Sequence, residues 1–252
     1  MLEKEECIAA IKRWKDHVKR YEAIQDLIDP LKLFSFNREQ INWLRSNNEF
    51  DFFHVYMGVL DKQMIIIVVP LDKNGKEKHL KSYVINKLQK MDAGGFRLVE
   101  EETTIKSRVA HFSQDLILSD YSEYIELSTV VEPIISLNTA IQEIEAWKNQ
   151  CRDWFYKECD CEEAGSNVFK AFNVPYTDLS GIGLGIDKVL CLFAFKYSEL
   201  YGRDIPTLIF IKTDTESQLS RLIQSTEQSN VYDWSQPCPP FCKDKLKFEL
   251  LQ

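Results

Sequence analysis

Residues 52–70, FFHVYMGVLDKQMIIIVVP, decide the fold of this chain. Two apolar runs, 52–59 and 64–70, flank residues 60–63, which predict a β-hairpin turn. Residues 64–69 are apolar at every position, so we expect this strand to be buried on both faces and central in its sheet. The remaining elements are placed around this hairpin.

A helix with one apolar stripe is expected before the hairpin, and a second stripe of the same pattern lies 133 residues further along. The first stripe consists of Ile8, Ile11, Trp14, Val18 and Tyr21, and the second of Ile141, Ile144, Trp147, Cys151 and Trp154. Spacings of three and four residues predict amphipathic helices, the first running from about Glu3 to Leu27 and ending before Pro30. A tryptophan occupies the same register in both stripes.

Two further elements recur in the same order. Residues 31–41, LKLFSFNREQI, correspond to residues 169–179, FKAFNVPYTDL, with Phe34 and Phe36 matched to Phe172 and Val174. Asn37 and Pro175 are each typical of the start of a short helix. A second strand pair, 189–196 and 207–211, follows with a longer connection, and the spacing between matched elements drifts only from 133 to about 142 residues.

We therefore predict an α+β fold produced by tandem duplication of one helix-plus-antiparallel-sheet unit, with helices packed on one face of each sheet. The boundary falls near Pro133, giving a first unit over 1–133 and a second over 134–252. The first unit carries an insertion at 76–128, in which a helix is expected from Leu80 to Met91. The second unit ends in a cysteine-containing tail.

Three features together suggest a known pattern: the Trp-containing helix at 8–21, the hairpin at 52–72 with its Asp-containing end, and the tail Cys238-Pro-Pro-Phe-Cys242. They resemble small uncharacterised bacterial proteins about one such unit long, which combine these same elements. This chain differs in having two units, with the cysteine tail only in the second. No activity is known for that family, so the resemblance implies an architecture and no function.

Charge and cysteine content indicate the expected compartment and partners. A net charge of −8 disfavours nucleic-acid phosphates and anionic lipid surfaces. The longest apolar run, 64–69, is too short to cross a bilayer, and the acidic start of the sequence lacks the apolar run of a secretory signal. Seven scattered cysteines favour a reducing compartment. We expect a cytoplasmic protein that binds neither nucleic acid nor membranes.

The cysteines are the main candidates for chemistry. Cys159 and Cys161, together with Cys238 and Cys242, supply the four thiols of a tetrahedral zinc site if the fold brings the pairs together, although their spacings are not those of common zinc sites. The prolines between Cys238 and Cys242 also fit a disulfide or dithiol pair. A rigid tail with thiols buried as small apolar groups is the third interpretation.

Other motifs carry weaker signals. Residues 181–186, GIGLGI, precede a strand and lack the last glycine of a dinucleotide-binding loop, so a flexible connection explains them better. The four histidines, His17, His54, His79 and His111, form no helical metal-binding pair. His54 lies on a predicted strand beside Tyr56, where a half-buried structural histidine is favoured over a general base. We assign no catalytic residue and no cofactor.

The leading hypothesis is a binding or interaction protein without a catalytic site, with a protein or small-molecule partner in the crevice between the two units. The aromatic side chains proposed for that crevice are Trp43, Tyr56, Trp154 and Trp234. The alternative is a thiol-based or metal-binding protein that uses the cysteine pair of the tail. A hydrolase or transferase with dispersed catalytic groups stays open, because active sites assemble in space. The oligomeric state is left open.

Overall fold

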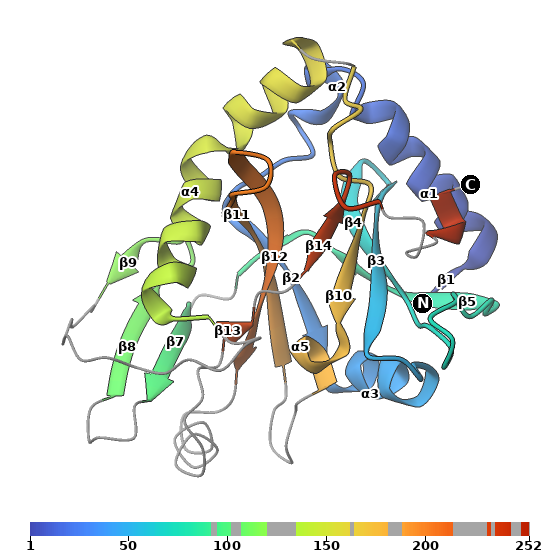
Figure 1. Ribbon diagram of the computed structural model, residues 1–252, viewed down its shortest axis with the longest axis horizontal. Helices are drawn as coiled ribbons and strands as arrows, with labels where there is room; N and C mark the ends of the chain where they lie inside the picture. Colours follow the sequence, from blue (N-terminus) through green and yellow to red (C-terminus); the bar gives the residue numbers. More distant parts are fainter. Residues whose placement is uncertain are drawn as a thin grey trace.

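The computed structural model describes residues 1–91, 95–101, 107–119, 135–161, 164–180, 188–213, 231–232, 235–242 and 248–251 (Figure 1). Helices are mixed with sheets whose described strand pairs are all antiparallel, which confirms the α+β prediction. Within the described ranges, no helix is both long and apolar enough to cross a membrane.

The expected hairpin forms as β3 (Phe52–Leu60) and β4 (Gln63–Val69). Asp61 and Lys62 connect the strands with φ angles of 49° and 60°, and two positive φ angles are what a tight two-residue hairpin turn requires. β4 pairs with β3 on one side and with β5 (Ser82–Lys87) on the other, and Met64 to Val69 are all buried. The prediction of a central, doubly buried strand is therefore confirmed.

Two large sheets contain strands from both sides of residue 133. The first sheet has the order β1-β5-β4-β3-β10-β14, in which β1 is Leu2–Glu3, β10 is Ala171–Pro175 and β14 is Gln236–Cys238. The second has the order β13-β12-β11-β2-β6, in which β13 is Val231–Tyr232, β12 is Arg203–Thr213, β11 is Lys188–Ser198, β2 is Lys32–Asn37 and β6 is Gln89–Lys90. A third sheet contains β7 (Phe96–Glu101), β8 (Ser107–Phe112) and β9 (Leu118–Ser119).

The two large sheets exchange one strand each. β2, from the first half of the sequence, pairs with the second hairpin, and β10, from the second half, pairs with the first hairpin. The two exchanged pairings have matching register: Phe34 and Phe36 lie opposite Cys191 and Val189, whereas Phe172 and Val174 lie opposite Val55 and Phe53. Each half of the sequence thus supplies a neighbouring strand to the hairpin of the other half.

The long helices cover equivalent strands. α1 (Lys4–His17) packs on β3 and α4 (Leu137–Tyr156) packs on β11, and Figure 1 shows the two helices on opposite flanks of the molecule. α1 ends earlier than expected, because the segment up to Leu27 includes a separate short helix, α2 (Tyr21–Ile24).

The shorter helices begin where the sequence indicates. Asn37 caps α3 (Arg38–Asn47), because its side chain accepts a hydrogen bond from the backbone N–H of Gln40, and α5 (Tyr176–Ser180) follows Pro175 directly.

The prediction of a helix from Leu80 to Met91 is wrong. This segment forms β5 and β6 instead, and Tyr83 and Val84 are buried. The physical reason is tertiary: β4 offers an unpaired edge, and the aromatic and β-branched residues at 83–85 suit a strand that pairs with it.

One core joins the two halves of the sequence. The indole N–H of Trp14 donates a hydrogen bond of 2.8 Å to the carbonyl oxygen of Phe169, and the two rings lie 5.8 Å apart. The ring of Phe169 also lies 6.4 Å from that of Trp147, which in turn stacks on Phe193 at 4.7 Å. Aromatic contacts of this kind bury large apolar areas and also contribute through ring geometry.

Candidate functional site: the second hairpin and the disulfide loop

The second hairpin carries exposed apolar side chains in its turn and at the adjoining end of β11. Tyr197, Leu200 and Tyr201 are 63%, 77% and 41% exposed. Along β11, Phe193 and Phe195 face the core beneath Trp147, and Tyr197 is the next residue on that same face because side chains alternate along a strand. The row of aromatic side chains on this face of β11 therefore extends from the buried core to the solvent-exposed Tyr197.

A pocket of about 300 Å³ opens beside this row, between the last turns of α4 and the hairpin. Trp154 and Phe195 provide its apolar lining. Arg203 stands at the rim, where its guanidinium lies 3.2 Å from the carboxylate of the buried Glu158. The pocket thus combines aromatic walls with a charged rim and can accept a single side chain of a partner.

The cysteine tail forms a disulfide loop that touches the hairpin. Cys238 and Cys242 are bonded to each other; Cys238 is 3% exposed, whereas Cys242 is exposed. The ring of Phe241 within the loop lies 5.5 Å from that of Tyr201. We call Tyr197, Leu200, Tyr201 and Phe241 the hairpin-end surface.

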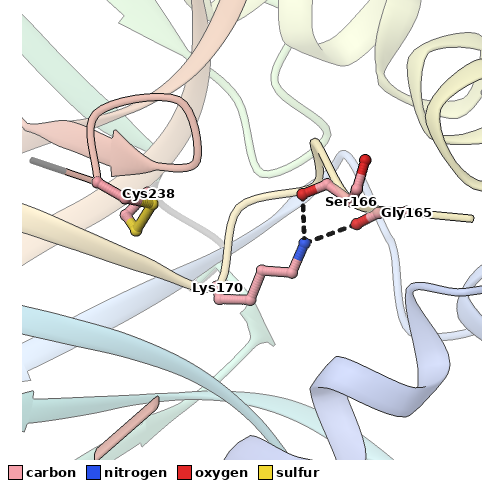
Figure 2. Close-up of a disulfide and its surroundings, with 5 residues drawn as sticks. Gly165, Ser166, Lys170 and Cys238 are labelled. Atoms are coloured by element: carbon pink, nitrogen blue, oxygen red, sulfur yellow. Dashed lines mark hydrogen bonds between the residues drawn. A yellow bond between two sulfur atoms is a disulfide. The ribbon is translucent and has the colours of Figure 1, made fainter. Parts of the chain in front are cut away.

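The loop is anchored from the side of β10. The backbone N–H of Lys170 donates a hydrogen bond of 2.7 Å to the carbonyl oxygen of Cys238. The ammonium group of Lys170 points away from the disulfide and donates to the carbonyl oxygens of Gly165 and Ser166 at 2.6 and 2.9 Å (Figure 2). Burial lowers the pKa of Lys170 to about 8. These bonds fix the disulfide loop next to the hairpin end.

Gly165 allows this anchor to form. Its φ angle is +72°, and a Cβ there would collide with the backbone carbonyl of Val18 at the end of α1. Only glycine combines this φ angle with so close an approach.

The first hairpin has a hollow in the equivalent place. A pocket of about 600 Å³ lies between α1 and the β3–β4 turn, and Arg13 in it donates a hydrogen bond of 2.8 Å to the carbonyl oxygen of Val59. Its turn residues, Asp61 and Lys62, are charged, whereas the second hairpin exposes tyrosine and leucine. Both hairpin ends therefore have a pocket between the hairpin and its covering helix, but their turn residues differ in chemistry.

The other two candidate metal ligands, Cys159 and Cys161, are free thiols. Cys159 is buried, which raises the pKa of its thiol to about 12, and Cys161 is exposed. Over the described part of the chain, no three histidine, cysteine or acidic side chains gather as a metal site would need. Zinc binding by all four cysteines stays a prediction, and it would first require reduction of the disulfide.

A second polar site surrounds His54. The Nδ1 atom of His54 lies 2.6 Å from Oε1 of Glu77, and the hydroxyl of Tyr56 donates to the same carboxylate oxygen. His54 and Glu77 are each only 1% exposed, so His54 is fully buried and not half-buried as expected. The pKa of Tyr56 is raised by burial and by the negative charge of Glu77.

This cluster has two unsatisfied atoms. Nε2 of His54 and Oε2 of Glu77 have no hydrogen-bond partner among the residues that the structure describes. A buried polar atom without a partner costs about 1–3 kcal/mol, so the cluster is a candidate for function. The sequence pointed to His54 but missed Glu77, because 23 positions separate them and only the return of the chain after β4 brings them together.

The aromatic side chains proposed for a crevice have mixed positions. Trp43 and Trp154 are half-buried, whereas Tyr56 is completely buried. Tyr56 is therefore unavailable to a partner at the surface. Trp234 and the glycine-rich residues 181–186 lie outside the described residues.

Comparison of the chain with models of protein families, with curated proteins and with solved structures finds no match.

Proposed function

We propose that this chain is a binding protein without a catalytic site, which holds another protein at the hairpin-end surface. The observation that carries the proposal is the exposure of Tyr197, Leu200 and Tyr201 at the end of one hairpin. Contiguous exposed apolar side chains mark interaction sites, and tyrosine is enriched in protein interfaces.

A protein fits this surface better than a nucleic acid. The chain carries a net charge of −8, and the charges next to the hairpin turn have both signs, with Glu199 and Asp204 beside Lys196 and Arg203. Phosphates need a predominantly basic surface. A protein partner can pair with both signs and insert one side chain between Trp154 and Phe195.

We place the partner at the hairpin end in preference to a crevice between the halves. Trp14 and Phe169 come from different halves of the sequence and are in direct contact, as part of one buried cluster. That contact supports a site at the hairpin end over one in a crevice between the halves.

A photo-reactive amino acid at position 200 tests this proposal. We expect one discrete crosslinked partner in cells when Leu200 carries the probe, and no such adduct when Lys62, at the turn of the first hairpin, carries it. The changes Tyr197→Ser and Tyr201→Ser together should reduce the adduct at least about thirtyfold, as expected for two interface anchors. Equal labelling from both turns, or an adduct that survives the two changes, would contradict the proposal.

We also infer that the chain arose by tandem duplication, with units over 1–133 and 134–252. The inference is supported by the recurring order of helix, strand, short helix and hairpin, and by the matching register of the two exchanged strand pairs. We place the protein in the cytoplasm on the basis of its five free cysteines, four of which are buried. In a reducing compartment the Cys238–Cys242 disulfide would be a transient, redox-active bond and not a structural one.

A second candidate function is thiol exchange, which the Cys238–Cys242 disulfide favours. Only the Cys242 side is exposed, so the thiolate of an external dithiol would attack Sγ of Cys242 and release Cys238 as a thiolate. The second sulfur of the dithiol then attacks its own mixed disulfide. Cys242 leaves as a thiolate, and the dithiol is oxidised to a disulfide.

Alkylation of the native protein tests thiol exchange. Without reductant, we expect rapid labelling of Cys161; after mild treatment with dithiothreitol, Cys242 should be labelled as well, before Cys238. In the variant Cys238→Ser, glutathione should remain attached to Cys242. If dithiothreitol adds no label to the folded protein, this function is excluded.

A further inference from the structure

The segment Phe248–Leu251 lies against α1 and covers the His54 cluster. Phe248 and Leu250 are buried, and the ring of Phe248 is 4.3 Å from that of His54 and 5.8 Å from that of Tyr56. Figure 1 shows this segment beside α1, on the opposite side of the molecule from α4. Its last three residues, Glu249–Leu251, form one turn of 3-10 helix outside the three sheets.

Side chains of the rest of the protein hold the backbone of this segment. The N–H of Leu250 donates to the hydroxyl of Tyr56 at 3.4 Å, and the ammonium group of Lys15 donates to the carbonyl oxygen of Leu251 at 2.9 Å. Two apolar side chains point inward, and Glu249 between them turns to His79, 3.1 Å away. The segment is thus held through its backbone as well as through its side chains, as docked peptides are. We call the surface that it covers, formed by α1, Tyr56 and His79, the groove.

The groove is basic where the segment is acidic. His79 contacts Glu249 and also lies 3.4 Å from the ammonium group of Lys4, and Lys15 stands at the end of the segment. Charges arranged in this way select an acidic residue in the middle of an apolar peptide.

The resident segment does not satisfy the floor of the groove. Beneath Phe248, Nε2 of His54 and Oε2 of Glu77 find no partner in the described part of the chain. Each unpartnered atom makes the covered state less favourable than a fully paired one. The contact with the resident segment is therefore weaker than a fully paired contact would be.

We propose that this groove is a peptide-binding site that the chain occupies with its own Phe248–Leu251. The ligand it accepts from another protein is a segment with the same chemistry: an aromatic residue, an acidic residue and two leucines in succession. The resident segment competes at high effective concentration, because it belongs to the same chain. This site is independent of the hairpin-end surface, so either proposal can fail alone.

A synthetic peptide of residues 247–252, KFELLQ, is the probe. We expect the full-length variant with Phe248→Ala and Leu250→Ala to bind this peptide with 1:1 stoichiometry, at least about tenfold more tightly than the unchanged protein, because the competing segment is weakened. A peptide with alanine in place of the phenylalanine should not bind. The imidazole NMR signals of His54 should shift in the variant and return towards their original positions when the peptide is added.

Controls in the same variant locate the site. Adding Lys15→Ala or Tyr56→Phe should weaken peptide binding several-fold, because each removes a backbone contact. If the double variant does not fold, Glu249→Lys replaces it, since that change opposes His79 and leaves both apolar contacts in place. A folded variant that does not bind the peptide, or equal affinity in variant and unchanged protein, would overturn the proposal.

Discussion

Replacing Trp14 by alanine is expected to lower the free energy of unfolding by about 4 kcal/mol. The side chain is completely buried, packs against the tilted ring of Phe169 and donates its N–H to the backbone carbonyl of that residue. Its removal leaves a cavity and an unpaired carbonyl oxygen. Because a domain is stable by only about 5–15 kcal/mol, this loss should be visible as a large shift of the urea midpoint.

Two matched variants show whether the cause is the one stated. Trp14→Phe keeps an aromatic ring and removes only the hydrogen bond, so a loss of about 1 kcal/mol is expected. Trp43→Ala removes a half-buried tryptophan of α3 and should cost less than half as much as Trp14→Ala. A loss below about 1 kcal/mol for Trp14→Ala would show that the two halves are not held together through this contact.

Replacing Glu77 by alanine is expected to cost about 3 kcal/mol at neutral pH. Glu77 is the common hydrogen-bond acceptor of His54 and Tyr56, and all three side chains are buried. Removing the carboxylate leaves two donors without a partner in the core. Chemical denaturation monitored by tryptophan fluorescence measures the effect.

Glu77→Gln separates the loss of the acceptor from the loss of charge. The amide oxygen can still accept from Tyr56 or from His54, so we expect a cost of about 1 kcal/mol. Glu22→Ala, at an exposed glutamate, should change stability by less than about 0.5 kcal/mol. Equal costs for Glu77→Ala and Glu77→Gln would mean that the charge, and not the shared acceptor, dominates.

Local patterns in the sequence were sufficient for several elements. The hairpin turn at Asp61 and Lys62, the helix start at Asn37 and the doubly buried strand β4 all lie where they were expected. Each depends on neighbouring residues: on turn geometry, on a capping side chain, or on an unbroken apolar run.

The candidate sites were less accessible from the sequence. The cysteine pair was singled out, and a disulfide was among its interpretations. The exposed row at Tyr197, Leu200 and Tyr201 was missed, because alternation along a strand does not reveal where the neighbouring helix stops covering it. Glu77 was missed because its stretch, 73–78, reads as a polar loop until its partners on β3 are known.

By itself, the sequence determined the type of most elements, their order along the chain and the turn that closes the first hairpin. The tertiary structure alone decided that β5 is a strand, that β2 and β10 change places between the sheets, and that Phe248 covers His54. The physical reason is the separation along the sequence of the residues that interact. A turn or a helix cap is stabilised by residues a few positions apart, whereas strand exchange and burial depend on which sheet edges and apolar faces remain free after the whole chain has folded.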